Sequence, residues 1–255
     1  MPEVNIVDTT VEILDGVGSY CLRSMKQTNG YQRKQNWLKQ ELEVGLRYVQ
    51  ILEGKKQKGF IEYTESENAS RAIYADGYIV IHCLWVSDNQ AGYGSQLIQT
   101  CISEAKEKQQ KGVVVVTNNQ TGWAPSKEVF IKNGFVKVDE ALDEFELFVY
   151  KCTETDNNPY FPTNWKERTN IYQDLTILRS FQCPYVEVAT ENVRIAAEQI
   201  GIPLTVIDLK TSEDIKELAP TPYGIYHVLF KGKLISFHRL TARTAYKKIK
   251  ALLEE

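Results

Sequence analysis

A glycine-bearing turn between two segments of different hydrophobic pattern is the part of the sequence best suited to bind an anion. It consists of Asn89, Gln90, Ala91, Gly92, Tyr93, Gly94 and Ser95. Two glycines let backbone N–H groups converge where the following helix begins, and the helix dipole adds positive potential there. A turn of this kind suits a pyrophosphate or a similar group. The sequence therefore indicates a nucleotide-type ligand.

Two familiar phosphate-binding loops do not fit this turn. A Walker loop ends in Gly-Lys-Ser/Thr, and no lysine follows these glycines. A dinucleotide fingerprint has a third glycine where this sequence has Leu97. The flanking elements still suit a cradle, because an apolar strand over residues 78–86 precedes the turn and an amphipathic helix follows it. The expected apolar face of that helix carries Leu97, Ile98, Cys101, Ile102 and Ala105, and its polar face carries Gln99, Ser103, Glu104 and Lys106.

The turn resembles the pyrophosphate loop of the GNAT acyltransferases, (Arg/Gln)-x-x-Gly-x-(Gly/Ala), except that Asn89 stands at its first position. Downstream, Gly134 and Phe135 match the end of the family's Tyr-x-x-x-Gly-Phe helix, with Phe130 in place of the tyrosine. Upstream, residues 58–63 look like the central hairpin strand of that family. The resemblance covers residues 1–152. It implies a GNAT fold of α/β (α+β) class, with a mixed, mostly antiparallel sheet flanked by helices, and acetyl-CoA as co-substrate, bound by residues 89–95 together with Leu84 and Val86.

The same resemblance implies acetyl transfer to an amine by direct attack in a ternary complex. The amine must be neutral to attack a thioester, so a base must accept its proton. On a flat strand Tyr78, Val80 and His82 share one face, and an imidazole with an ordinary pKa near 6.5 suits this role. Glu62 and Tyr78 are weaker candidates, and His82 could instead be a core residue. Cys83 is expected to be buried and to point away from the active face.

Residues 173–255 show a second pattern, βαβαββα, which is the order of a thioredoxin or glutaredoxin fold. Cys183-Pro184-Tyr185 looks like the glutaredoxin Cys-Pro-Tyr-Cys motif with Val186 replacing the second cysteine. Thr221-Pro222 looks like the cis-proline beside the reactive cysteine of that fold. An acyltransferase with such a tail resembles the YoaP-like proteins. At a helix N-terminus the Cys183 thiolate would be stabilised by the dipole, so a thiol partner is possible there.

The predicted organisation is an acyltransferase domain over 1–152, a linker over 153–172 and the thioredoxin-like domain over 173–255. Two helices are expected within 9–45. Strands are expected at 46–53, 58–65, 71–86, 112–117, 135–139 and 145–151, and in the tail at 175–181, 204–209, 225–230 and 234–240. The aromatic linker residues Tyr160, Phe161 and Trp165 are expected to be buried. Helices are expected from Val186 to Gly201, from a cap at Ser212, and over 242–253.

Composition narrows the functional class. Of 255 residues 43% are hydrophobic and 25% charged, and a net charge of −3 argues against a nucleic-acid binder, because phosphate neutralisation needs a concentrated basic surface. That charge leans towards a cationic small acceptor. No apolar run is long enough for a membrane span, and no signal peptide is visible. Five cysteines suggest a reducing compartment, so the cytoplasm is expected. The histidine and cysteine spacing predicts no metal site, and a monomer or homodimer is expected.

Two functions remain open from the sequence. The first is an acetyl-CoA-dependent N-acetyltransferase. The second is a coenzyme A-binding and thiol-handling module, resembling a monothiol glutaredoxin at Cys183, with little or no acetyl transfer. Asn89 and Phe130 keep the second alternative open, because both depart from the acyltransferase pattern.

Overall fold

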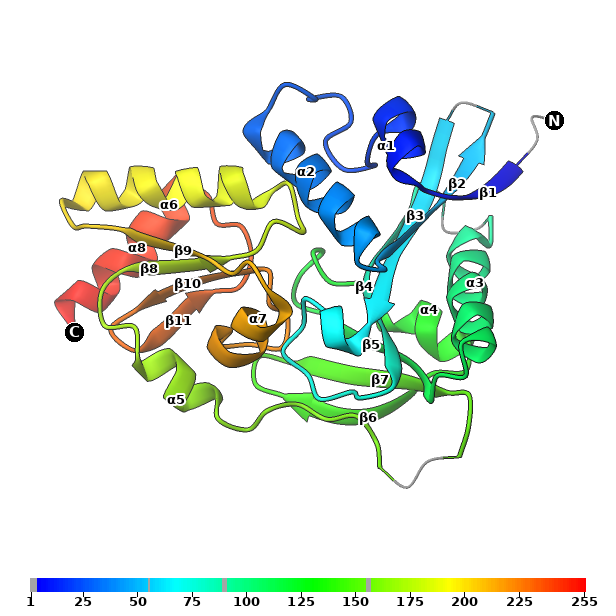
Figure 1. Ribbon diagram of the computed structural model, residues 1–255. Helices are drawn as coiled ribbons and strands as arrows, with labels where there is room; N and C mark the ends of the chain where they lie inside the picture. Colours follow the sequence, from blue (N-terminus) through cyan, green and yellow to red (C-terminus); the bar gives the residue numbers. More distant parts are fainter. Residues whose placement is uncertain (1–3, 55, 89–90, 155–156) are drawn as a thin grey trace. The chain divides into compact units, whose positions relative to one another are not determined.

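The computed structural model describes the chain except for residues 1–3, 55, 89–90 and 155–156 (Figure 1). The described chain forms two compact units. Unit 1 comprises residues 1–23, 38–69 and 73–161, and unit 2 comprises residues 24–37, 70–72 and 162–255. Helix α2 (Asn29–Glu43) contributes its first part to unit 2 and its last part to unit 1. The domain limits drawn from the sequence stay a prediction.

Unit 1 is built on a seven-stranded sheet in the order β1-β2-β3-β4-β5-β7-β6. Within the described residues, β4 and β5 are the only neighbouring strands of this sheet that run parallel, so the predicted mixed, mostly antiparallel sheet is confirmed. The sequence analysis missed the first strand, whose Val4 and Ile6 side chains are exposed, so it lacks the one-sided burial of a typical strand. The strands are β1 (Val4–Asp8), β2 (Arg47–Glu53), β3 (Lys56–Glu65), β4 (Tyr78–Val86), β5 (Gly112–Asn118), β6 (Val136–Ala141) and β7 (Phe145–Lys151).

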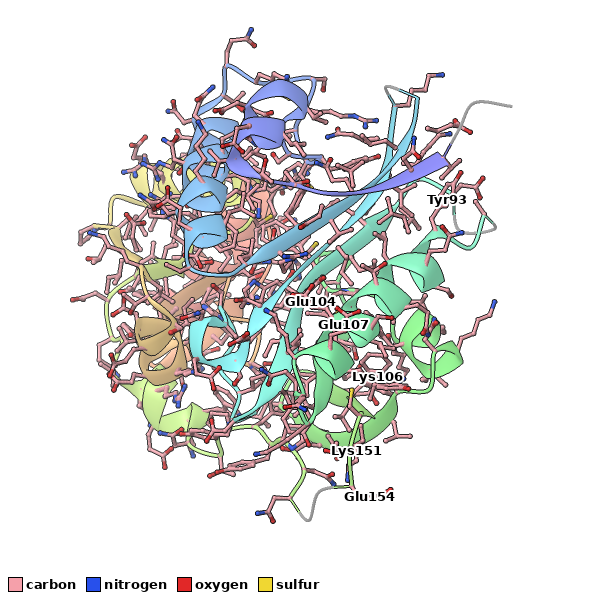
Figure 2. All side chains as sticks on the ribbon, turned by 45° about the vertical axis from the view of Figure 1, so that its right-hand side comes forward. Tyr93, Glu104, Lys106, Glu107, Lys151 and Glu154 are labelled. Carbon is pink, nitrogen blue, oxygen red and sulfur yellow. The ribbon has the colours of Figure 1, made fainter. Side chains whose placement is uncertain are left out.

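Helices α3 (Tyr93–Glu107) and α4 (Lys127–Lys132) cover one face of this sheet, and their buried side chains join its core. The apolar face predicted for α3 is confirmed. On its polar side, Glu104 accepts a hydrogen bond from the Tyr63 hydroxyl at 2.6 Å, and Figure 2 labels Glu104, Lys106 and Glu107 along it. Helix α1 (Val11–Val17) and the segment after it lie on the other face. There the centroid of the Tyr20 ring is 5.7 Å from that of the Phe60 ring. A short 3-10 turn, η1 (Ser66–Asn68), follows β3.

Two expectations about segments beside the sheet need correction. The strand predicted over 71–86 begins only at Tyr78, because Gly77, with φ of +80°, forms a turn before it. Tyr74 instead pairs with Tyr160 in an isolated bridge. Of the linker aromatics, Phe161 and Trp165 are buried as predicted, whereas Tyr160 is 55% exposed and only its ring packs against Tyr74.

Unit 2 contains the element order predicted for the tail, βαβαββα. Its four-stranded sheet has the order β11-β10-β8-β9, with β8 and β9 parallel. Gly201 ends the first long helix in a left-handed conformation, as predicted, whereas the next helix is capped by Thr211 in a capping box with Asp214, not by Ser212. The elements are α5 (Trp165–Asn170), β8 (Thr176–Arg179), α6 (Val186–Ile200), β9 (Thr205–Asp208), α7 (Ser212–Leu218), β10 (Tyr226–Phe230), β11 (Lys233–Ser236) and α8 (Ala242–Glu254).

The predicted cis-proline at Pro222 is wrong, because the described residues contain no cis peptide bond. The trans form is the default for an X–Pro bond unless packing selects the other isomer. In this conformation the carbonyl oxygen of Pro222 accepts a hydrogen bond from the Ala72 N–H at 3.2 Å. That bond lies within unit 2 and ties residues 70–72 to the turn before β10.

His227 in β10 makes the stability of unit 2 depend on pH. Burial lowers the pKa of this imidazole to about 3, and its Nε2 lies 2.9 Å from the Thr221 hydroxyl. Below about pH 6.5 the imidazole therefore binds a proton in the unfolded chain but not in the folded unit. The free energy of unfolding of unit 2 falls as the pH falls. From pH 7 to pH 5 unit 2 is expected to lose about 2 kcal/mol through this group.

Denaturant unfolding of unit 2, followed in the whole chain at both pH values, tests this expectation. The His227→Gln variant is expected to lose about 2 kcal/mol less than the wild type over the same interval. Equal losses in the two proteins would show that the imidazole is not kept neutral by the fold.

Candidate functional site

The site predicted for coenzyme A lies in unit 1, where β4 and β5 part. Their parallel pairing covers Tyr78–Ile81 and Gly112–Val115 in the described chain, while β4 continues to Val86 and β5 to Asn118. The second half of β4 therefore offers backbone N–H and C=O groups along the edge that turns away from β5. Unpaired backbone groups of this kind are ready to bind an extended polar ligand.

A cavity of about 690 Å³ lies at this opening. Three structural segments line it: the end of β4, the glycine turn with the start of α3, and the loop after β5 with α4. Its volume is within the range of small-molecule and cofactor sites. The lining residues are Leu84, Trp85, Val86, Gly92, Gly94, Ser95, Gly122, Ala124, Pro125, Ser126, Glu128, Val129 and Lys132.

Glycine is required at the two positions of the turn for different structural reasons. Gly92 caps α3 with φ of +73°, a left-handed conformation that strains other residues. Gly94 is buried in the first turn of α3, where a Cβ would meet the Val129 side chain at 3.3 Å. Ala91 and Tyr93 lie beside them, whereas Asn89 and Gln90 fall outside the described residues. The start of α3 thus forms part of the cavity wall.

Ser95 is held at the cavity wall by helix α4. Its hydroxyl oxygen accepts a hydrogen bond from Asn133 Nδ2 at 3.0 Å, and Asn133 Oδ1 accepts one from Gln99 Nε2 at 3.1 Å. These bonds join the first turn of α3 to the end of α4. They fix the helix terminus that is expected to face an anion.

His82 and Glu62 form a buried acid–base pair on the other face of the sheet. The His82 Nδ1 atom lies 3.5 Å from Glu62 Oε1, and the two side chains are 0% and 1% exposed. Glu62 lies within β3, an interior strand of the sheet. An imidazole beside a carboxylate is an arrangement suited to proton transfer, because the negative charge stabilises the protonated ring.

A β-bulge produces this pairing. Glu62 lies opposite Cys83 and Tyr63 lies opposite Ile81, so His82 is the extra residue of β4. The sequence analysis placed Cys83 on the face away from His82, and this is wrong, because residues directly opposite in an antiparallel pair share a face. Cys83 is also half-buried rather than buried. The bulge therefore brings a thiol to the face of the acid–base pair.

Tyr48 of β2 lies on the same face. Burial holds the pKa of Tyr48 well above its usual value, the nearby Cys21 raises it further, and the Tyr20 N–H, which donates to the Tyr48 hydroxyl at 3.0 Å, lowers it. Glu62 and Cys83 also raise the pKa of Tyr48. This phenol is therefore a neutral hydrogen-bonding group near the pair, and the sequence analysis did not single it out.

Two other sequence candidates lie elsewhere. Tyr78 is at the far end of β4, four residues before His82, which is about 13 Å along a strand. Phe130 is fully buried and packs edge-on against Phe135 with ring centroids 5.3 Å apart. Cys101 is buried in α3 as predicted, and burial raises the pKa of its thiol. The structure thus brings together His82 and Glu62 but not Tyr78.

The loop after β5 is the part of the cavity that sequence reasoning missed. Its residues from Asn118 to Ser126 are rich in Asn, Thr, Gly and Pro, which marks a loop but gives no hint of a ligand. Asn118 fixes its start, since the side chain donates to the Asp143 carbonyl oxygen at 2.6 Å and accepts from the Gln120 N–H at 2.8 Å.

In unit 2, Cys183 is half-buried in the turn before α6. Residues from other parts of the sequence surround this turn. A Cβ on Gly30 would lie 2.2 Å from the Pro184 carbonyl oxygen, and the Arg71 guanidinium donates to Gln182 Oε1 at 2.7 Å. The turn is therefore packed closely against residues 24–37 and 70–72, which belong to the same unit.

In the part of the chain that the structure describes, no group of three or more His, Cys, Asp and Glu side chains is placed to hold a metal ion. Among the same residues, no helix combines the length and apolar character needed to cross a membrane.

Comparison with known proteins gives one relative across nearly the whole chain. No protein-family model matches. The sequence is 26% identical over 233 residues to the uncharacterized N-acetyltransferase YoaP of Bacillus subtilis strain 168, covering 90% of this chain and 91% of that protein.

Two solved structures are similar to about three fifths of this chain. YncA of Salmonella typhimurium, solved with its cofactor acetyl-CoA, has a TM-score of 0.46 at 11% identity, and the match covers 61% of this chain and 98% of that one. The PaiA N-acetyltransferase of Thermoplasma acidophilum, in complex with coenzyme A, has a TM-score of 0.43 at 14% identity and covers 58% and 99%. This chain is thus similar over most of its length to YoaP of Bacillus subtilis.

Proposed function

We propose that this protein is a GNAT-type acyltransferase that moves the acetyl group of acetyl-CoA to an amine by direct attack. The observation that carries the proposal is the cavity at the β4–β5 opening, which has a glycine turn and a helix N-terminus at its wall. The buried His82–Glu62 pair lies on the same strand pair. The similarity to YoaP, a protein named as an N-acetyltransferase, supports it.

In this proposal coenzyme A lies along the second half of β4. Backbone groups at Leu84 and Val86 hydrogen-bond the extended arm, and the N–H groups of residues 91–95 bind the pyrophosphate, helped by the positive end of α3. Lys132 adds a positive charge to the cavity wall. Asn89 and Gln90 complete the expected turn, although they lie outside the described residues.

The reaction in this proposal needs one base and one leaving group. The amine nitrogen attacks the thioester carbonyl carbon, a C–N bond forms, and the C–S bond then breaks to release the coenzyme A thiolate. His82 accepts the proton that the amine loses, while Glu62 orients the imidazole and stabilises its protonated form. Because Phe130 has no proton to donate, the thiolate takes its proton from water or from the protonated His82. The products are an N-acetyl amine and free coenzyme A.

Calorimetric titration with acetyl-CoA, followed by a thiol-release assay with tetraglycine, lysine and spermidine as amines, tests the proposal. Micromolar binding and amine-dependent release of free thiol are expected. A protein that binds no acetyl-CoA, or one that binds it but releases no thiol with any amine, would contradict acetyl transfer.

One observation in unit 2 supports the alternative function, thiol handling. Cys183 stands in a closely packed turn before α6, with arginine side chains near the turn: Arg71 bonds Gln182, and Arg33 lies with its guanidinium carbon 5.4 Å from the centre of the Phe181 ring. Cationic neighbours and a helix N-terminus favour the thiolate form of a cysteine. We therefore propose, as a second candidate, that unit 2 forms mixed disulfides through Cys183.

A single substitution separates this second activity from the first. Cys183→Ser is expected to leave the rate of acetyl transfer within about two-fold of the wild type, since direct attack uses no cysteine. Labelling with a thiol reagent near neutral pH is expected to lose its fastest-reacting site in the same variant. A loss of acetyl transfer in Cys183→Ser would instead tie the cysteine to the reaction.

A further inference from the structure

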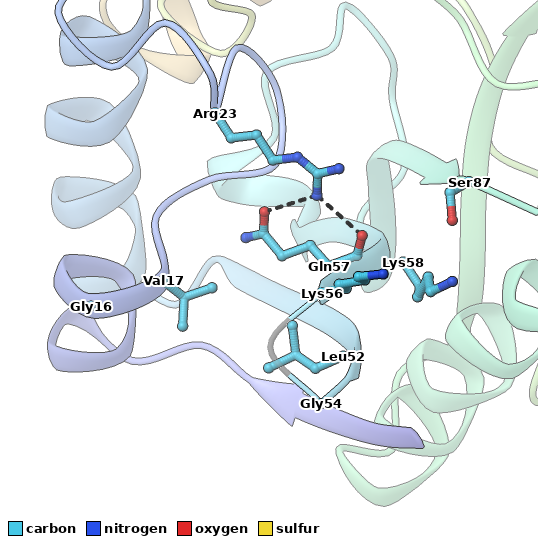
Figure 3. Close-up of a pocket in the computed structure, with 9 residues that line it drawn as sticks. All are labelled: Gly16, Val17, Arg23, Leu52, Gly54, Lys56, Gln57, Lys58 and Ser87. Atoms are coloured by element: carbon cyan, nitrogen blue, oxygen red, sulfur yellow. Dashed lines mark hydrogen bonds between the residues drawn. The ribbon is translucent and has the colours of Figure 1, made fainter. Parts of the chain in front are cut away.

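A second cavity in unit 1 has a strongly one-sided charge. It has a volume of about 750 Å³ and lies between the end of α1, the β2–β3 hairpin and the residue that follows β4 (Figure 3). Three of its nine lining residues are cationic, namely Arg23, Lys56 and Lys58, and none is acidic. A concave surface lined by one sign of charge concentrates ligands of the other sign.

The charge of Arg23 is held in place by neutral partners. Its Nη1 atom donates to the carbonyl oxygen of Gln57 at 3.1 Å and to Gln57 Oε1 at 3.4 Å, as the dashed lines of Figure 3 show. Gln57 is in turn fixed by bonds from its Nε2 to the Gly18 carbonyl oxygen at 3.0 Å and to Gln50 Oε1 at 2.7 Å. The guanidinium is therefore preorganised without being neutralised, because no carboxylate in the described chain pairs with it.

The other two cations differ in their pairing. Lys58 forms an ion pair with Glu53 at 2.9 Å, and this hydrogen bond raises the pKa of Lys58. Lys56 has no ion pair with any described residue. The negative charge of Asp88 also raises the pKa of Lys58. With Glu53 and Asp88 both acting on Lys58, the charges of Arg23 and Lys56 remain for a ligand. An oxyanion such as a carboxylate or a phosphate matches this arrangement, since guanidinium and ammonium groups donate charge-assisted hydrogen bonds to both.

The cavity adjoins the proposed acetyl-CoA site. Trp85 and Val86 line the cavity at the glycine turn, and the next residue, Ser87, lines the basic one. The ring of Tyr20 connects the two, because it packs 4.3 Å from the Trp85 ring and lies under the Arg23 guanidinium at 4.4 Å. From Lys58 to Glu62 the β3 strand spans four residues, which is about 13 Å. The basic cavity is thus on the sheet face of the acid–base pair, and the backbone of its lining residue Lys58 lies about 13 Å along the strand from Glu62.

We propose that this basic cavity binds an acid group of the amine acceptor, so that the acceptor is an elongated molecule with a carboxylate or phosphate about 13 Å from the reacting nitrogen. The proposal rests on the proposed function for its amine and extends it by naming the substrate class. It opposes the expectation from net charge, because the surface that meets the acceptor is basic although the chain as a whole carries −3.

Titration with inorganic phosphate in the presence of saturating coenzyme A tests the anion site itself. Phosphate is expected to bind at one site, about ten-fold or more weakly in Arg23→Gln and in Lys56→Gln, because each loses a charge-assisted hydrogen bond. Gly16→Leu is expected to weaken binding too, since a Cβ on Gly16 meets nothing within 4 Å and a larger side chain enters the cavity. Lys106→Gln, an exposed charge change on α3, is the matched control and keeps wild-type binding.

Coenzyme A is the other possible source of phosphate groups, and the same variants distinguish it. If the cavity served the cofactor, saturating coenzyme A would abolish phosphate binding, and Arg23→Gln would lose the preference for coenzyme A over dephospho-coenzyme A. Either result, or phosphate binding equal in Arg23→Gln and the wild type, would overturn the proposal.

A pair of peptides then tests the link to the acceptor. Extended tetraglycine places its carboxylate about 13 Å from its amine, and tetraglycine amide lacks that charge. The wild type is expected to bind the acid about ten-fold more tightly than the amide, and Arg23→Gln is expected to lose this preference. Equal binding of the two peptides to the wild type would overturn the acceptor role. If phosphate and the peptide acid bind as expected but no thiol is released from acetyl-CoA, the result contradicts the proposed acetyl transfer. The proposed anion site is then still supported.

Discussion

Replacing His82 with glutamine is expected to lower kcat for acetyl transfer by about 10²- to 10⁴-fold, the usual contribution of a positioned general base. Glutamine keeps a similar side-chain length and a polar end, but it cannot accept the proton of the attacking amine. The affinity for acetyl-CoA is expected to stay within about two-fold, because the cofactor cavity is lined by later residues of β4 and not by His82. Thiol release and calorimetry on the same preparation separate the two quantities.

Burial makes a control necessary, since His82 is 1% exposed and its replacement can lower stability as well as activity. The thermal midpoint of each variant therefore has to be measured, and kcat expressed per folded enzyme. A folded His82→Gln protein that keeps wild-type kcat would show that His82 is a core residue only. Glu62→Gln removes the carboxylate charge beside the imidazole and is expected to lower kcat by about 10- to 100-fold, the effect of losing a neighbouring opposite charge.

A substitution at Cys83, which neighbours the acid–base pair, distinguishes direct attack from transfer through a cysteine. It lies opposite Glu62 on the same face and is half-buried. If the amine attacks acetyl-CoA directly, Cys83→Ala keeps kcat within a few-fold of the wild type. If the acetyl group instead passes through a thioester on this cysteine, Cys83→Ala abolishes transfer, and the mechanism proposed here is wrong.

The β-bulge that places His82 and Cys83 on one face could not be predicted from the local sequence pattern. Period-two alternation along Tyr78–Val86 correctly puts Val80 and His82 on the face of Glu62, but it also puts Cys83 on the opposite face. Whether a strand carries an extra residue depends on its pairing with β3, which is more than ten residues away in sequence. Local pattern cannot report that register, so the half-buried thiol beside the acid–base pair became visible only in the folded chain.

Features built from one continuous segment are predicted far better. The apolar face of α3 follows from residues spaced three and four apart, and the end of α6 follows from Gly201, because both signals lie within a single helix. The basic cavity is the opposite case. Arg23, Lys56 and Ser87 come from three separated segments, so neither the net charge nor any motif predicts that their side chains share one cavity.

Replacing Gly92 with valine is expected to weaken acetyl-CoA binding by about 100-fold or more. Gly92 caps α3 at φ of +73°, where a β-branched residue is strained, so the turn must shift to relieve the strain. That shift misdirects the N–H groups that the proposed pyrophosphate site uses. Loss of two hydrogen bonds to a charged ligand, at about 1.5–3 kcal/mol each, gives a change of this size. Calorimetric titration with acetyl-CoA measures it.

The loss of acetyl-CoA affinity in Gly92→Val points to the turn only if backbone strain elsewhere in the chain does not cause the same loss. A substitution at Gly45 is the control for this. Gly45 has φ of +103°, and like Gly92 it would place a Cβ with nothing within 4 Å, but it lies outside the lining of the cofactor cavity. Gly45→Val is therefore expected to lower the thermal midpoint while leaving acetyl-CoA affinity unchanged. Gly92→Ala adopts a left-handed conformation at a cost of about 1–2 kcal/mol, so an intermediate loss is expected. If Gly92→Val and Gly45→Val weaken binding equally, the turn is structural and the cofactor binds elsewhere.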